Sequence, residues 1–496
     1  MDSVATLEFG EFAPDQPDTK ISVTGGKNVI PAAIGYTSLK RPVAITDSIN
    51  ERARGAFAAR DSLGLVYNYV GDTTKLYALN ADISHTDSTR TSGAYATADE
   101  EFWEFVKFGD DVYASNFSDY VQRISMGGTN FSDVTAAPQA RHIGIINNFL
   151  VAGNINESGI ITPNKVRWSA INNPDNWTPT TANQSGEQVL YSTAENGGGW
   201  IQKVVGGEEG LIMQEYSIWR MQYVGGDLIF QFSELAPGIG TPSRNSVIEL
   251  GQQIFFLGQD GFYKIVNATT VEPIGESKVD RWFFDNVRDG ALDRVIGAAD
   301  NSRRIVAWLY PDSSATSDTP NKIIFYNWAI GRWSPPTEIN AEWLFPSLSV
   351  AKNTDDNIAT FTDDLDKLVD SRDYSGGELQ LGLYDTANKK SSFSGSALTA
   401  RLDTVEAQLF GGRRSHITGV RPLVEGDVAS ITASVGYRDN LNNESVSFTT
   451  ASSPETDTNI CHQRVDARYI KARINTSGEF NHLVGAEIFG KPSGSR

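Results

Sequence analysis

The chain repeats one local pattern: a short apolar strand, a tight turn, a second apolar strand and a short connection to a third. In the unit at residues 243–274, Asp260 and Gly261 separate the apolar run 254–257 from the apolar run 262–265. Asp-Gly between apolar runs predicts a tight β-hairpin. Four short antiparallel strands within about 40 residues are typical of one blade of a β-propeller.

Six such units follow one another at spacings of about 40–60 residues, the period expected of propeller blades. A seventh is expected from residues 344–350 and 358–361, completed by a strand from the N-terminal arm. We therefore predict an all-β fold, with a β-propeller of six or seven blades. A pair of β-sandwiches would show the same strand pattern and stays open as an alternative. The six units cover residues 55–79, 102–124, 142–169, 201–232, 247–274 and 295–326.

The pattern of the chain changes at both ends of this repeat region. Residues 1–45 are rich in proline and glycine with little periodicity, which predicts an extended N-terminal arm. An acidic run at 363–370 separates the repeats from longer strands with period-two alternation, typical of an antiparallel β-sandwich. The predicted domains are an arm at 1–45, a propeller at 46–365 and a C-terminal sandwich-like β domain at 366–496.

The net charge of −19 argues against a surface that grips nucleic acid, because DNA affinity comes mainly from neutralising phosphates. An acidic wall is still compatible with a passage through which DNA slides without sticking. The single cysteine, Cys461, excludes an intrachain disulfide. The N-terminal residues lack a basic and an apolar region, so we expect no signal peptide, and no apolar run is long enough to span a bilayer.

The sequence shows no catalytic signature. It contains no Gly-x-Ser-x-Gly elbow, no His-Glu-x-x-His motif, no phosphate loop and no repeated sialidase turn. Cys461 and His462 are adjacent in a predicted strand and should point to opposite faces, which argues against a catalytic dyad. We therefore expect a protein that is not an enzyme and has no catalytic, cofactor-binding or metal-binding residues. The five scattered histidines are His85, His142, His416, His462 and His482.

Each of two clusters of charge has a structural and a functional interpretation. The acidic run could supply calcium ligands, but its spacing does not match an EF-hand loop, and a solvated linker is the simpler interpretation. The basic residues of the C-terminal domain could gather on one face against an acidic neighbour in an assembly. The acidic residues are Asp363, Asp364, Asp366, Asp370 and Asp373; the basic residues are Arg401, Arg413, Arg414, Arg421, Arg464, Arg468, Lys471 and Arg473.

Two segments resemble bacteriophage virion proteins. Residues 166–179, with Arg167-Trp168-Ser169 followed by Pro174 and Asn176-Trp177, are similar to a segment of these proteins, and 411–423 resembles a C-terminal segment of the same group. The order of tryptophan-containing strands in 280–328 is similar to that of the packaged-DNA stabilisation and tail-nozzle proteins of short-tailed phages. The resemblance spans about residues 140–490 as a pattern.

This resemblance implies a propeller with added β domains, assembled as a ring around the DNA channel of a phage tail. The expected partners are further copies of the chain in a hexameric ring, the tail adaptor, tail fibres, and double-stranded DNA that passes without sequence-specific binding. The expected location is the virion, after synthesis in the host cytoplasm. Two other functions stay open: a propeller that binds or cleaves surface glycan, and a scaffold with one peptide-binding face.

Overall fold

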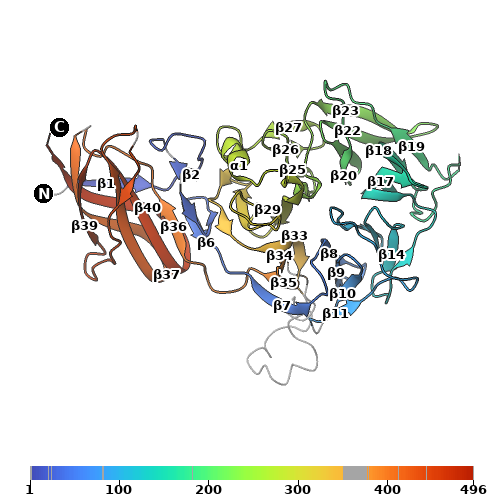
Figure 1. Cartoon of the computed structure of the whole chain (residues 1–496), viewed down its shortest axis with the longest axis horizontal. Helices are drawn as coiled ribbons and strands as arrows, with labels where there is room; N and C mark the ends of the chain where they lie inside the picture. Colours follow the sequence, from blue (N-terminus) through green and yellow to red (C-terminus); the bar gives the residue numbers. More distant parts are fainter. Residues whose placement is uncertain are drawn as a thin grey trace, which may run out of the picture.

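The computed structural model describes residues 3–494, except 21, 24, 81–82, 181, 350–376, 378, 412 and 443. Within these residues, apolar strands joined by tight turns form seven antiparallel sheets that stand around one axis as the blades of a β-propeller (Figure 1). The first strands of neighbouring blades lie against one another around that axis. The all-β prediction and the seven-bladed alternative are both confirmed.

The blades are numbered here in chain order. Among the described residues, each has four strands except blade 6, which has five. Blade 1 comprises β8 (Gly55–Arg60), β9 (Val66–Gly71), β10 (Leu76–Leu79) and β11 (His85–Asp87); blade 2 comprises β12 (Glu104–Phe108), β13 (Asp111–Ser115), β14 (Gln122–Ser125) and β15 (Ser132–Asp133); blade 3 comprises β16 (Gln139–Ile146), β17 (Phe149–Glu157), β18 (Ile160–Trp168) and β19 (Gly186–Val189).

The later blades follow the same order of strands. Blade 4 comprises β20 (Ile201–Val205), β21 (Glu209–Gln214), β22 (Ser217–Gly225) and β23 (Ile229–Pro237); blade 5 comprises β24 (Ile248–Leu250), β25 (Gln253–Leu257), β26 (Phe262–Val266) and β27 (Thr270–Pro273); blade 6 comprises β28 (Ile296–Asp300), β29 (Ile305–Tyr310), β30 (Lys322–Asn327), β31 (Arg332–Trp333) and β32 (Thr337–Glu338). Helices η1 (Arg244–Ser246), α1 (Asp280–Asn286) and η2 (Leu292–Arg294) lie in the connections between blades 4 and 5 and between blades 5 and 6.

Blade 7 closes the ring and combines distant parts of the chain. It consists of β33 (Ala341–Leu348), β34 (Leu379–Asp385), β35 (Lys389–Ser392) and β7 (Val43–Ser48). In the ladder between β35 and β7, Ser391 pairs with Ala44 and Ser392 with Val43. The expected closing strand from the N-terminal part of the chain is therefore present, while the expected strand at 358–361 lies outside the described residues.

The predicted boundary between residues 365 and 366 falls inside blade 7. Strands β34 and β35, which follow it, pair with β33 and β7 of the propeller. The sequence missed this because an acidic run interrupts the blade, and the strands after it look like those of the next body. The strands of the C-terminal body begin only with β36 (Ala400–Asp403).

The C-terminal body is one antiparallel sheet built on two long strands, β37 (Arg414–Arg438) and β40 (Tyr469–Ser493). The alternation in the sequence predicts each as two separate strands, at 416–423 and 429–437 and at 469–474 and 485–490. Gly426 lies within β37 and Gly478 within β40, and both have positive φ. Both lie close to shifts in the pairing register of the two strands. These glycines therefore bend continuous strands instead of ending them. Ile417 from one half and Val435 from the other share one apolar core, as in a sandwich. The shorter strands are β38 (Ser447–Phe448) and β39 (Cys461–Ala467).

The N-terminal segment joins the propeller to this body. Strand β1 (Ser3–Glu8) pairs with β40 along six residues, from Ser3 opposite Gly490 to Glu8 opposite Gly485. Further along, β4 (Gly26–Lys27), β5 (Val29–Pro31) and β6 (Tyr36–Ser38) add to the same sheet, and β2 (Glu11–Phe12) pairs with β3 (Ser22–Val23). Figure 1 shows this segment passing between the two bodies before β7 enters the propeller. One apolar cluster runs from the C-terminal sheet through this segment into blades 5 and 6.

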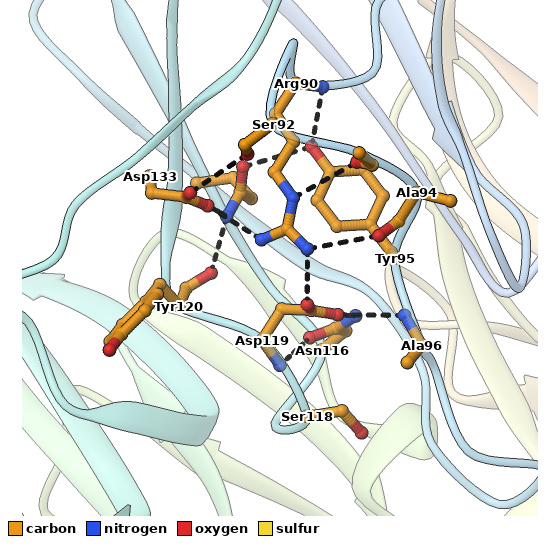
Figure 2. A network of polar contacts seen from close by, with 12 residues as sticks. Arg90, Ser92, Ala94, Tyr95, Ala96, Asn116, Ser118, Asp119, Tyr120 and Asp133 are labelled. Carbon is orange, nitrogen blue, oxygen red and sulfur yellow. Dashed lines mark hydrogen bonds and ion pairs between the residues drawn. The ribbon is translucent and has the colours of Figure 1, made fainter.

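Ion pairs fix the connection between blades 1 and 2. In Figure 2 the guanidinium of Arg90 lies between two carboxylates of blade 2, with Nη2 2.7 Å from Asp119 and Nη1 2.8 Å from Asp133. The same guanidinium lies 4.6 Å from the ring centre of Tyr95. Burial by itself would lower the pKa of Arg90, but the two carboxylates outweigh it and raise that pKa. The network holds the segment 88–103 against blade 2.

Candidate functional site at the propeller axis

Four charged or titratable side chains from four consecutive blades meet along the propeller axis. They are Glu104 on β12, His142 on β16, Lys203 on β20 and Glu249 on β24, each on the innermost strand of its blade. We call them the axial cluster. Each belongs to a strand that also carries apolar residues, and the ring of blades brings these strands together.

Glu104 is the centre of the axial cluster. One carboxylate oxygen accepts the backbone N–H of Ile143 at 2.9 Å and lies 3.2 Å from Nδ1 of His142. The other forms an ion pair with Lys203, which bridges blade 2 to blade 4. The side chains are 16% exposed for Glu104, 18% for Lys203 and 2% for His142. The ion pair therefore links blades 2 and 4 in a mostly dehydrated setting.

The pKa values of the two carboxylates of the axial cluster are shifted in opposite directions. Burial alone would raise the pKa of Glu104, but the charge of Lys203, then that of His142, lowers it to about 2. Desolvation raises the pKa of the exposed Glu249; the charge of Lys203 opposes this rise, and that of Glu104 adds to it. Burial lowers the pKa of His142, so its ring is neutral near pH 7. Its Nε2 has no hydrogen-bond partner among the described residues.

A second set of charges lies where the inner strands begin. Glu101 is 10% exposed and accepts Nη2 of Arg141 at 2.7 Å and Nη1 of Arg244 at 3.0 Å. The guanidinium of Arg244 also lies 5.0 Å from the ring centre of Phe102. Two further arginines support the same loop, because Arg54 donates to the backbone oxygen of Glu101 and Arg52 to that of Asp99. These arginines fix the loop over this end of the axis.

The inner strands therefore hold one matched pair of opposite charges together with a second carboxylate whose pKa is raised. Both oxygens of Glu104 are engaged by positive or N–H groups, which leaves it a poor base or nucleophile. Among the described residues, no group of three His, Cys, Asp or Glu side chains could hold a metal ion. The acidic run at 363–373 lies outside the described residues.

The other histidines have separate environments. His85 joins blade 1 to blade 7, with Nδ1 2.7 Å from Asp47 and Nε2 3.0 Å from the hydroxyl of Tyr384. Cys461 is fully buried while the neighbouring His462 is exposed, so the two side chains point to opposite sides of β39. His416 lies across from Asp466 on the same sheet. His482 lies on β40, and its Nδ1 is buried without a hydrogen-bond partner in the described structure.

Much of the expected positive surface of the C-terminal body is neutralised within the chain. Arg414 pairs with Asp466 and Asp439, both at 2.6 Å, and Arg421 pairs with Glu487 at 2.7 Å. Arg473 pairs with Asp403 at 2.7 Å, and Lys471 lies 3.9 Å from Asp18. Arg401 lies on β36, Arg468 precedes β40, and Arg413 and Arg464 are exposed.

The segment that resembles phage proteins has a structural role in blade 3. Nε1 of Trp168, at the end of β18, donates to the backbone oxygen of Gln184 at 2.8 Å. Arg167 donates to the backbone oxygen of Trp177 at 3.0 Å. Trp177 is 1% exposed and packs in the apolar core between blades 2 and 3. The segment therefore anchors the loop after β18.

Sequence reasoning singled out His142 but did not connect it with the other members of the axial cluster. The available signal was a charged residue among the apolar residues of the first strand of a repeat, as with Glu104, Lys203 and Glu249. Aligning the repeats on their first strands would have placed these residues at one level of a propeller.

No family model matches the chain, and no curated protein matches it. Among solved structures, virginiamycin B lyase from Staphylococcus aureus is similar at a TM-score of 0.40 and 11% identity, over 71% of this chain and 97% of that one. The WD40 domain of Neurospora crassa Pan2 is similar at a TM-score of 0.37 and 9% identity, over 73% of this chain and 96% of that one. BamB from Moraxella catarrhalis is similar at a TM-score of 0.34 and 8% identity, over 75% of this chain and 97% of that one.

The arrangement of the sheets defines the chain as a seven-bladed β-propeller with an attached C-terminal β-sheet. This is a fold that enzymes and non-enzymes share. Within the described residues, no helix is long and apolar enough to span a membrane.

Proposed function

We propose that the protein is a non-enzymatic structural component of a bacteriophage tail, part of a nozzle or hub ring that extends the DNA channel. The observation that carries the proposal is how the first 48 residues join the two bodies: β1 extends the C-terminal sheet and β7 closes the propeller. A chain joined in this way holds its two bodies together through strand pairing and a shared apolar cluster, as a building block of an assembly requires. The two segments that resemble phage virion proteins support the same function.

In this proposal DNA passes through the centre of a ring of copies and not along the axis of a single propeller. The ion pair between Glu104 and Lys203 links the innermost strands of blades 2 and 4 in each propeller. With a net charge of −19, the wall formed by several copies would repel phosphate, so DNA would slide without adhering. The proposed partners are identical chains in a hexameric ring, the tail adaptor and the tail fibres, and the proposed location is the virion.

Light scattering and negative-stain imaging of the purified protein test this function, each with and without purified tail-adaptor rings. A ring of about six copies, alone or on the adaptor, supports it. Adaptor rings from an unrelated long-tailed phage are the control. A stable monomer that binds neither adaptor contradicts the proposal.

One observation favours a second function, a propeller that binds or cleaves glycan. Glu104 and Glu249 lie in the same axial cluster with pKa values shifted in opposite directions, a pattern found in glycosidases. The engagement of both Glu104 oxygens weighs against cleavage. A glycan array with the wild-type protein and with Glu249→Gln separates the two functions, since binding that Glu249→Gln alters would support the glycan function.

A further inference from the structure

A polar cavity of about 740 Å³ lies on the C-terminal body, away from the propeller axis. Its lining contains two imidazoles, three threonine hydroxyls, one amide and one guanidinium. These belong to His416, Thr418, Thr449, Thr450, His462, Gln463 and Arg464.

The cavity forms where the ladder between β37 and β39 is interrupted. Ile417 pairs with Val465, and the next pair joins Gly419 to His462. The residues left out of the ladder are Thr418 on one strand and Gln463 and Arg464 on the other, and all three line the cavity. Such β-bulges change the direction of side chains and are common next to binding sites. We call this feature the bulge cavity.

Hydrogen bonds to the rest of the C-terminal body fix one wall of the bulge cavity. Gln463 is 5% exposed, and its Nε2 donates to the backbone oxygen of Ala433 at 3.0 Å and to Oγ of Ser452 at 2.8 Å. The hydroxyl of Thr449 donates to Oε1 of Gln463 and accepts the backbone N–H of Val435 at 2.9 Å. These groups are committed to the fold, so the wall does not have to reorganise when a ligand binds.

The other lining residues supply donors. The guanidinium of Arg464 is exposed and forms no ion pair with any described carboxylate. His462 is 70% exposed and touches Glu455 through Nε2 alone, at 3.3 Å, so its Nδ1 is unengaged. His416 lies 4.0 Å from Asp466, whose oxygens are bound by Arg414 and Ser493. The exposed hydroxyl of Thr450 completes the set.

We propose that the bulge cavity binds a small ligand through a tetrahedral oxyanion, a phosphate or sulfate ester, with Arg464 as its charge partner and His416, His462 and Thr450 as hydrogen-bond donors. A guanidinium flanked by imidazole and hydroxyl donors matches the oxygens of such an anion. The volume exceeds that of a bare phosphate ion, which leaves room for the organic group of an ester. The lining has no tryptophan, tyrosine or phenylalanine ring on which a neutral sugar would stack. This inference does not depend on the proposed tail function.

Histidine ring signals in the NMR spectrum of isotope-labelled full-length protein test the proposal, because the chain has only five histidines. The titrants are glucose 6-phosphate, glucose 6-sulfate and neutral glucose, so that the arms distinguish the two anions from the sugar. We expect saturable shifts of the His416 and His462 signals, assigned with His416→Gln and His462→Gln, and no shifts of the other three. Glucose should have no effect.

Arg464→Gln should weaken binding at least about 10-fold, as loss of a charge-assisted contact does. Arg281→Gln is the matched control, because it removes an exposed arginine from α1 of the propeller. Circular dichroism confirms that both variants are folded. Absence of saturable shifts, equal shifts with glucose, or unchanged affinity in Arg464→Gln would each overturn the proposal.

Discussion

Glu104 on β12 and Lys203 on β20 form an ion pair that joins the second and fourth blades past the third. The pair is mostly buried, and His142 and the backbone of Ile143 satisfy the remaining acceptor sites of Glu104. A buried pair of this kind is costly to break, because removal of one partner leaves the other charge without compensation.

Glu104→Gln should therefore destabilise the protein by about 3 kcal/mol at pH 7, the range measured for removing one partner of a buried pair. The pKa of Glu104 falls from an ordinary 4.5 to about 2 on folding, so its stabilising contribution is present above pH 4.5 and is lost as the pH falls toward 2. Urea unfolding at pH 7 and pH 3 measures both effects. Glu208→Gln, at an exposed carboxylate in the turn after β20, is the control; equal stabilities of the two variants would refute the prediction.

Lys390 on β35 is buried and faces the oxygens of Asn68 and Leu348, both at 3.3 Å from Nζ. Burial lowers its pKa from 10.5 to about 7. The side chain of Lys390 binds its proton less tightly in the folded state than in the unfolded state. It therefore makes the free energy of unfolding rise between pH 7 and pH 10.5, and its destabilising effect is complete below pH 7.

Lys390→Met should abolish that part of the pH dependence. We expect the melting temperature of the variant to exceed that of the wild type at pH 6, with a smaller difference at pH 9. Thermal unfolding followed by circular dichroism at both pH values measures this. Lys389→Met, at the adjacent and less buried position, should leave the wild-type slope unchanged; a difference for Lys390→Met that does not vary with pH would contradict the assignment.

Trp177→Ala should cost about 3–5 kcal/mol, because it opens a cavity in the core between blades 2 and 3. Trp200→Ala is the matched control, since Trp200 is 51% exposed, and we expect a change within about 0.5 kcal/mol. Chemical denaturation of the two variants compares them directly. Similar losses from both substitutions would show that Trp177 does not anchor the loop after β18.

Deletion of residues 1–8 should expose the edge of β40 that β1 covers. Hydrogen–deuterium exchange is expected to speed up for peptides covering residues 485–490, because the amides that bond to β1 lose their partners while the pairing with β37 remains. Peptides from β28 and β29 in blade 6 serve as the internal reference and should keep their protection. Unchanged exchange at 485–490 would mean that β1 does not stabilise the C-terminal sheet.

The strand pattern predicted the fold to the level of blades, because turn residues such as Asp260-Gly261 act locally and the period-two alternation marks strand faces. The limits of the C-terminal body were harder to predict. Gly426 and Gly478 look like turn residues in sequence, but a glycine with positive φ serves equally in a bulge within a continuous strand. Whether such a glycine ends or bends a strand depends on the partner strand.

The sequence by itself determined the all-β class, the repeat of blades and the closing strand near the N-terminus, since each follows from local turn chemistry and apolar patterning. Only the tertiary structure decided which charges meet. Glu104 and Lys203 lie on separate blades, and Thr418 meets Arg464 through an interrupted ladder. The physical reason is that alternation tells which face of a sheet a side chain occupies, while closure of the ring and strand register decide what lies opposite it.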